Sequence, residues 1–320
     1  MLLPWGLFGG IRLLMRALIL RRLFTALPTL LAVVVLSFVL MKVAPGGPFD
    51  GERAIDPATQ AALARAYGLD LPLHEQLWRY LARLAHGDFG PSLVYRDFTV
   101  TDLVTQGLPV SLTLGGLALV LALVLGIGAG LWAASRAGGI VDEALMMAMT
   151  LLTALPSFVV GPLLALMFGL WAGWLPVSGW GGGDPAHLVL PVVALALPMT
   201  GAIAKLARAG LATALAQDHI RTARARGLPP ARILLRHALR PALVPVASYL
   251  GPAAAGLLTG AVVIETVFAL PGLGGYFVQG ALNRDYPLVL GVVTLYAALI
   301  LLFNLLADLA YGWLDPRIRG

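Results

Sequence analysis

Long apolar runs without a single charge constrain this chain more than any other feature. Six of them are long enough to cross the hydrocarbon core of a bilayer as α-helices, and none contains Asp, Glu, Lys, Arg or His. With 59% hydrophobic and 12% charged residues, the chain lacks the polar skin of a soluble protein. The sequence therefore predicts an all-α, polytopic membrane protein with six transmembrane helices. The predicted spans are residues 23–41, 110–134, 144–172, 188–204, 243–264 and 288–307.

The distribution of charge predicts the orientation of these spans. Residues 1–22 contain four arginines and no acid, and residues 205–240 contain eight basic residues against one acid. Residues 43–109 instead carry eight acids and five arginines. Because cytoplasmic loops carry an excess of Lys and Arg, both termini and the 205–240 loop are expected in the cytoplasm. No small-residue cleavage pattern follows the first run, which favours a retained span over a cleaved signal peptide.

Four segments follow from this topology. They are a cytoplasmic amphipathic segment (1–22), the first span (23–42), an extracytoplasmic segment (43–109) and a five-span core (110–320) that contains the cytoplasmic loop 205–241. Leucines at helical spacing predict an amphipathic helix within the extracytoplasmic segment. This helix is interpreted as a lid on the membrane surface with partial contact to another protein, and a full seat for such a protein is the alternative. The leucines are Leu73, Leu77, Leu81 and Leu84.

No pattern typical of catalysis or metal binding is present. The chain has no cysteine, its five histidines never recur at i, i+4, and no G-x-x-x-x-G-K-[ST] loop occurs. The chain is therefore not expected to be an enzyme, to hold a metal or to bind ATP itself. Spans without ionisable groups disfavour a proton-coupled secondary carrier. A loop anchored in the bilayer at both ends is poorly placed to bind nucleic acid.

The cytoplasmic loop is the most informative stretch. Residues 206–226 are rich in Ala, Leu and Arg and predict one helix, which Gly227 ends. A second short helix is predicted over residues 231–239, ended by Pro241. The loop could be a knob that seats in a groove on another protein, or its arginines could only fix topology and contact lipid phosphates. The apolar stripe available to a partner is Ile233, Leu234, Ala238 and Leu239.

Residues 217–246, QDHIRTARARGLPPARILLRHALRPALVPV, closely resemble the coupling loop of binding-protein-dependent ABC permeases in its peptide-transporter form. In that family this element docks on the ATP-binding subunit. Gly227 matches the glycine of the family motif and Ala223 an alanine of its E-A-A triplet, whereas Arg221 replaces the glutamate, as in the first-subunit branch. An i, i+3 pair of Asp218 with Arg221 is expected. The implied coupling residues are Asp218, Arg221, Thr222, Ala223, Arg224, Gly227, Arg236, His237 and Leu239.

The resemblance extends over most of the chain. Residues 43–48 (VAPGGP), 68–93 and 315–319 look like blocks of the same family, and FALPGLG and NRDYP resemble its F-x-x-P-G-L-G and N-R-D-Y-P blocks. A tight or re-entrant turn is expected there, at the outer mouth. The implied outer-mouth residues are Phe268, Pro271, Gly272, Gly274, Asn283, Arg284 and Asp285.

The resemblance implies a type I ABC importer permease fold in the cytoplasmic (inner) membrane. It implies a permease subunit that moves di- or oligopeptides; nickel chelates, other small solutes, a secondary carrier or a non-transporting scaffold are the alternatives. The implied partners are a homologous second permease subunit, two cytoplasmic ATP-binding subunits that hold ATP and Mg²⁺, an extracytoplasmic solute-binding protein and membrane lipid. No cofactor is implied for this chain.

Overall fold

The described part of the chain, residues 5–43, 56–95 and 97–314 of a computed structural model, is almost entirely helical. Five helices are long and apolar enough to cross a membrane. The prediction of an all-α polytopic protein is therefore confirmed. These helices are α1 (Trp5–Val43), α4 (Val100–Ser135), α7 (Pro185–Leu215), α11 (Val244–Val267) and α13 (Tyr286–Leu314).

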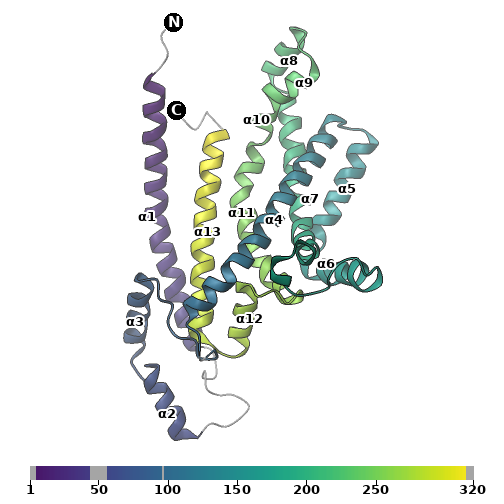
Figure 1. Cartoon of the computed structure of the whole chain (residues 1–320). Coiled ribbons are helices and arrows are strands. Elements are labelled where there is room, and N and C mark those ends of the chain that lie inside the picture. The colour runs from purple at the N-terminus through teal and green to yellow at the C-terminus, as the bar shows by residue number, and fades with distance from the viewer. Residues whose placement is uncertain (1–4, 44–55, 96, 315–320) are drawn as a thin grey trace.

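The third predicted span, residues 144–172, is not one straight helix. Helix α5 (Ile140–Ala154) and the pair formed by α6 (Ser157–Leu164) and the π-helical η1 (Ala165–Trp171) meet at an angle of 98°. Pro156 explains the break, because proline disfavours a helical conformation at the residue before it, and Leu155 is extended with φ −81° and ψ 118°. The protein has six spans only if this bent pair counts as one. In Figure 1, α6 runs across the direction of the bundle.

The two ends of the bundle carry different elements. At one end the short helices of the cytoplasmic loop lie with the first turns of α1 and the last turns of α13 (Figure 1). The opposite end carries three helices of the regions expected outside the cytoplasm, so elements expected on the same side of the membrane lie at the same end of the bundle. At the first end lie α8 (Asp218–Ala225), α9 (Pro230–Arg232), the π-helical η3 (Ile233–Ala238) and α10 (Leu239–Ala242). At the second lie α2 (Pro57–Ala66), α3 (Leu73–Ala85) and α12 (Leu273–Leu282).

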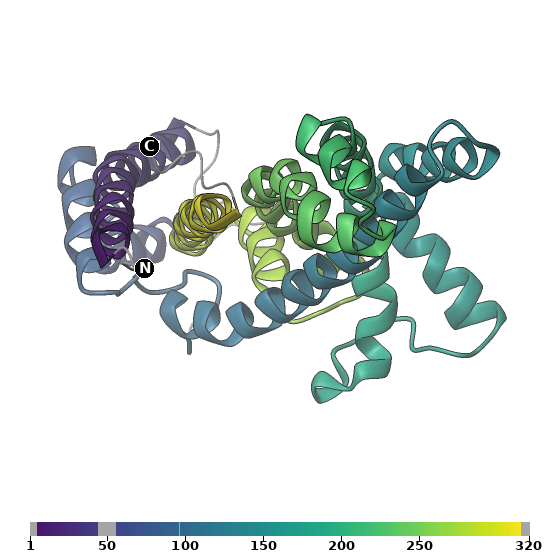
Figure 2. The same ribbon diagram turned by 90° about the horizontal axis from the view of Figure 1, so that it is seen from above.

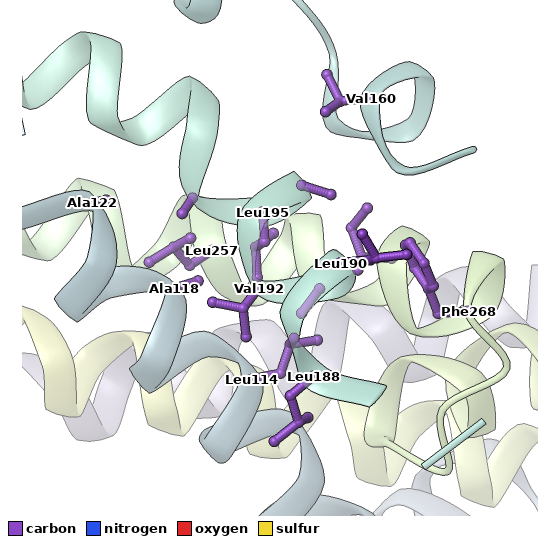
Figure 3. Packing of buried hydrophobic residues seen from close by; sticks show 14 of the residues in the cluster. Leu114, Ala118, Ala122, Val160, Leu188, Leu190, Val192, Leu195, Leu257 and Phe268 are labelled. Atoms are coloured by element: carbon purple, nitrogen blue, oxygen red, sulfur yellow. The ribbon is translucent and has the colours of Figure 1, made fainter. Parts of the chain in front are cut away.

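Helices α4 and α7 form the centre of the bundle. A Cβ added to Gly126 would lie 2.9 Å from Ile203, and one added to Gly130 would overlap the carbonyl oxygen of Ala204, so the two backbones touch along this seam. Glycines four residues apart permit such an approach between membrane helices. Figure 3 shows Ala118 of α4, Val192 of α7 and Leu257 of α11 converging in the buried cluster around this contact.

Helix α1 is peripheral. It packs mainly on α13, where the Arg22 Nε lies 2.6 Å from an Asp308 carboxylate oxygen. Figure 2 shows α1 at one edge of the molecule and α5 with α6 towards the other. The predicted N-terminal amphipathic segment continues into α1 without a break, and the side chains of residues 1–18 lie outside the described part. Residues 44–48 of the predicted block 43–48, and the predicted block 315–319, also lie outside it.

The predicted amphipathic helix over Leu73 to Leu84 is confirmed as α3. None of its residues is fully buried, and the Trp78 side chain is 72% exposed. Tyrosine, tryptophan and leucine on a helix beside the end of a membrane span are typical of the membrane–water interface. The placement agrees with the interpretation as a lid on the membrane surface.

Candidate functional site

The cytoplasmic loop forms a helical hairpin that projects from the end of the bundle (Figure 1). Helix α7 ends at Leu215, and α8 starts after Gln217, whose ψ of 151° is extended. The prediction of one helix over residues 206–226 is therefore wrong, because the chain turns at Ala216 and Gln217. The break lets α8 change direction so that it lies against the second half of the hairpin.

Gly227 makes the turn between the two halves. Its φ is +70°, and its N–H donates to the Arg224 carbonyl at 2.9 Å. Glycine reaches this left-handed conformation without the penalty that a side chain brings. No atom lies within 4 Å of an added Cβ, so backbone conformation and not crowding requires glycine here. The predicted C-terminal stop is confirmed.

The second half of the hairpin is longer than predicted. Helical structure runs from Pro230 to Ala242 and passes through Pro241, with π-helical hydrogen bonding over residues 233–238. In a π-helix the N–H bonds to the carbonyl five residues back. Ile233 and Ala238, which are five residues apart, both pack in the cluster with α7 and are buried. Two members of the predicted partner-facing stripe thus face inward, whereas Leu235 is 65% exposed.

One face of the hairpin packs and the other is open. The buried face consists of Ile220 and Ala223 from α8 with the apolar residues of η3 and α10, set against Leu211 and Ala214 of α7. Asp218 and Arg221 form the predicted i, i+3 pair, with 3.4 Å between Arg221 Nη1 and Asp218 Oδ1. Of the nine predicted coupling residues, six are exposed, His237 and Leu239 are partly buried, and Ala223 is buried. The exposed ones are Asp218, Arg221, Thr222, Arg224, Gly227 and Arg236.

Close packing shapes the predicted outer-mouth motif. After α11 the chain turns back through Phe268, which is buried, and enters α12. The Glu265 carboxylate accepts a hydrogen bond from the Gly274 N–H at 2.7 Å, and the Ser111 hydroxyl accepts one from the Leu273 N–H at 2.9 Å. These side chains from α11 and α4 bind the start of α12. The expected tight turn is present.

Glu265 lies inside a helix whose end was predicted one residue before it. The fifth predicted span ended at Ile264, but α11 continues to Val267 and buries Glu265 completely. Within the described residues its Oε1 and the Tyr296 hydroxyl have no hydrogen-bond partner. An acid at the end of an apolar run, followed by Pro and Gly, was the available signal.

The two glycines of the motif are required by contact. A Cβ on Gly274 would overlap the Val262 backbone, and one on Gly272 would overlap the Glu265 carboxylate. Asn283 is exposed, and Arg284 has a φ of +55° at the end of α12. The motif therefore begins with two glycines in close contact with α11 and ends with a turn that leads into α13.

Asp285 anchors the start of α13. It is buried, and its Oδ1 accepts from the Leu288 N–H at 3.2 Å in the manner of a helix N-cap. Its Oδ2 accepts from the Ser92 hydroxyl and from the N–H of Leu93 at 3.1 Å. Asp285 thereby ties the extracytoplasmic segment to the last span.

A half-buried ion pair between α5 and α7 was not predicted. Arg208 of α7 donates to both carboxylate oxygens of Asp142 in α5, at 3.0 and 2.6 Å, and the Gly138 N–H donates to Oδ2 at 3.0 Å. The Asp142 side chain is 3% exposed. Arg208 was counted only as a topology charge, and no spacing in the sequence connects it with Asp142.

The part of the chain that contains these elements matches a known protein family. Residues 126–320 match the family described as binding-protein-dependent transport system inner membrane component. The match contains the whole cytoplasmic hairpin and the outer-mouth motif.

Individual relatives resemble the chain over nearly its whole length. It is 49% identical over 302 residues to the oligopeptide transport system permease protein OppB of Escherichia coli (strain K12), covering 94% of this chain and 98% of the relative. OppB of Haemophilus influenzae is 47% identical over 301 residues, with the same coverage. The dipeptide transport system permease protein DppB of Bacillus subtilis is 42% identical over 299 residues, covering 93% of this chain and 96% of the relative.

Proposed function

Because this chain belongs to the family of binding-protein-dependent transport system inner membrane components, we propose that it is a permease subunit of an ATP-driven peptide importer. The peptide cargo rests on the relatives, which are oligopeptide and dipeptide permease proteins. The family is an inner membrane component and the apolar helices can cross a bilayer, so the chain is a multi-pass protein of the cytoplasmic membrane. A second, homologous permease subunit would complete the transport path, and an extracytoplasmic binding protein would deliver the peptide.

The energy for import comes from outside this chain in our proposal. The sequence contains no phosphate-cradling G-x-x-x-x-G-K-[ST] loop. ATP and Mg²⁺ would therefore be held by two cytoplasmic ATP-binding subunits. The chain contributes the surface that receives their movement and the helices that respond to it.

The observation that carries this proposal is the two-faced cytoplasmic hairpin. Its inner face packs against α7 through apolar side chains. Its outer face presents exposed arginines and the exposed Leu235. An apolar side chain within a basic surface suits a groove on another protein. Because α7 contacts both the hairpin and α4, a displacement of the hairpin by a partner would be transmitted through α7 to the α4–α7 seam.

Gly227→Pro tests the coupling. Proline fixes φ near −65° and removes the N–H that bonds to Arg224, so the hairpin cannot keep its turn. We expect ATPase stimulation by binding protein and peptide to be lost in proteoliposomes while the ATP-binding subunits still co-purify. The measurement is ATP hydrolysis with and without binding protein and a peptide mixture.

Gly173→Pro is the matched control. Gly173 also has a positive φ, +65°, and open space around its Cβ position, but it lies in the loop after η1, away from the hairpin. Stimulation is expected to persist in this variant. Normal stimulation in the Gly227 variant would mean that the hairpin arginines only fix topology, and the coupling proposal would be abandoned.

A further inference from the structure

A basic cavity lies at the outer end of two membrane spans. It has a volume of about 200 Å³ and is enclosed by the last turns of α1, the first turn of α13, helices α2 and α3 and the loop before α4. Figure 1 shows α3 beside the lower end of α1, and Figure 2 places the two at the same edge of the molecule. Because its walls are the ends of α1 and α13, the cavity lies at the depth of lipid headgroups.

Four cations line this cavity: Lys42, Arg65, Arg79 and Arg83. Arg79 pairs with Glu75 at 2.8 Å. Among the described residues, no carboxylate forms an ion pair with any of the other three. Tyr80, also in the lining, is neutral at physiological pH like any tyrosine, and burial raises its pKa further, to about 12, against the opposing hydrogen bond with Thr294. Within residues 5–43, 56–95 and 97–314, three of the four cations in the lining therefore lack a paired carboxylate.

Lys42 contacts two aromatic rings at this cavity, and no carboxylate of the described residues pairs with it. Its Nζ lies 5.8 Å from the centre of the Phe38 ring and 5.9 Å from that of Tyr286. Cation–π contacts stabilise an ammonium group without neutralising it. Lys42 can therefore still attract a negatively charged ligand.

An apolar groove adjoins the cavity. It has a volume of about 170 Å³ and shares Phe38 and Lys42 with the basic cavity. The remainder of its lining is mostly apolar: Val39, Val43, Leu73, His74 and Leu77. Lys42 thus lies at the boundary between a basic compartment and an apolar one.

We propose that this pair of compartments binds an anionic phospholipid of the outer leaflet, with the headgroup phosphate in the basic cavity and an acyl chain along the groove. A phosphate accepts hydrogen bonds from several guanidinium groups at once. The apolar groove favours a lipid over a free phosphate ion, which would leave the groove empty. The bound lipid would fasten α3 to the outer end of α1.

The test is a lipid titration of the full chain, purified with its co-purifying subunits in a nonionic detergent. Phosphatidylglycerol, phosphatidylcholine and inorganic phosphate are added separately, and bound lipid is counted by native mass spectrometry alongside thermal unfolding. We expect saturable binding and stabilisation with phosphatidylglycerol and little effect from the other two. Inorganic phosphate matching phosphatidylglycerol would overturn the lipid assignment in favour of a free anion.

Lys42→Gln and Arg83→Gln identify the site. Each should weaken phosphatidylglycerol binding about fivefold, as expected for one basic residue at a headgroup. Arg136→Gln is the matched control, since Arg136 also stacks on an aromatic ring, 5.3 Å from the centre of Trp132, but lies at the cytoplasmic end. Lys42→Arg, which keeps the positive charge, should bind phosphatidylglycerol as the unchanged protein does. This variant shows whether the glutamine variant loses binding through lost charge or through misfolding.

Two outcomes contradict the proposal. Unchanged phosphatidylglycerol binding in both glutamine variants would place the lipid elsewhere. If these variants instead lower ATPase stimulation by the binding protein at constant lipid binding, the cavity receives an acidic side chain of that protein and not a lipid.

Discussion

At the scale of single residues, Gly274, the last residue of the FALPGLG block, and its neighbour Gly275 differ in their surroundings. Both Gly274 and Gly275 lie in the first turn of α12. A methyl group on Gly274 would overlap the Val262 backbone, whereas one on Gly275 would meet only the Leu270 carbonyl oxygen at 3.4 Å, an ordinary contact. Alanine at Gly274 therefore tests packing against α11, whereas alanine at Gly275 tests helix propensity alone.

Gly274→Ala is expected to destabilise the protein by about 1–3 kcal/mol, because backbone atoms of α11 must move to admit the methyl group. Gly275→Ala should be neutral or slightly stabilising, since alanine favours helix. Thermal unfolding of the two purified variants in the same detergent measures the difference. Equal midpoints would show that α12 does not pack against α11 as described.

Residue patterns predicted local geometry better than contacts between distant residues. The turn at Gly227 and the Asp218–Arg221 pair follow from neighbours in the chain, and both are present. The Asp142–Arg208 pair joins two helices whose register no local pattern specifies. For the same reason the sequence did not indicate that Glu265 would bind the start of α12.

At the scale of the helices, the seam between α4 and α7 is the contact most sensitive to volume. Gly126 and Gly130 face α7, while Gly128 between them has no atom within 4 Å of an added Cβ. The three glycines thus share one helix but not one environment.

Gly130→Ala is expected to lower stability by about 1–3 kcal/mol, because the methyl group would push the two backbones apart. Gly128→Ala should raise it by up to about 1 kcal/mol through helix propensity. Folded yield and unfolding temperature in detergent give the comparison. A Gly128 variant as damaged as the Gly130 variant would mean that the seam lies on another face of α4.

Helix boundaries show where sequence reasoning succeeded and where it failed. Hydropathy identified every long span, because each needs about 20 apolar residues whatever its neighbours. It missed the bend at Pro156, since a window average hides one proline inside an apolar run. The break at Ala216 had no local signal at all, because helix-forming residues surround it and packing against η3 decides the direction of α8.

At the scale of the whole molecule, the two ends of the bundle are predicted to face different compartments. Trp78 and Leu235 are both largely exposed, and they belong to α3 and to η3, which the chain joins to α9 and α10 of the hairpin. Figure 1 shows α3 and the hairpin helices at opposite ends of the bundle. The chain has no native cysteine, so a single introduced thiol reports one position without background.

In intact cells that express this chain alone, Trp78→Cys should react with a membrane-impermeant maleimide. Leu235→Cys should react only after the membrane is opened, because the charge distribution places the hairpin in the cytoplasm. Labelling followed by gel-shift analysis provides the measurement. Reactivity of the Leu235 variant in sealed cells would reverse the orientation.

The pairing of α1 with α13 has a consequence for the order in which the protein is made. The first span to leave the ribosome packs mainly on the last one, and Arg22 meets Asp308 across that contact. Until translation is almost complete, α1 must remain stable in lipid without this partner, which its strongly apolar and mostly unburied stretch Ile19–Val43 allows. Within this chain, the contact between α1 and α13 is therefore the last helix pair that can form, and a chain truncated before α13 would leave its first helix without its main packing partner.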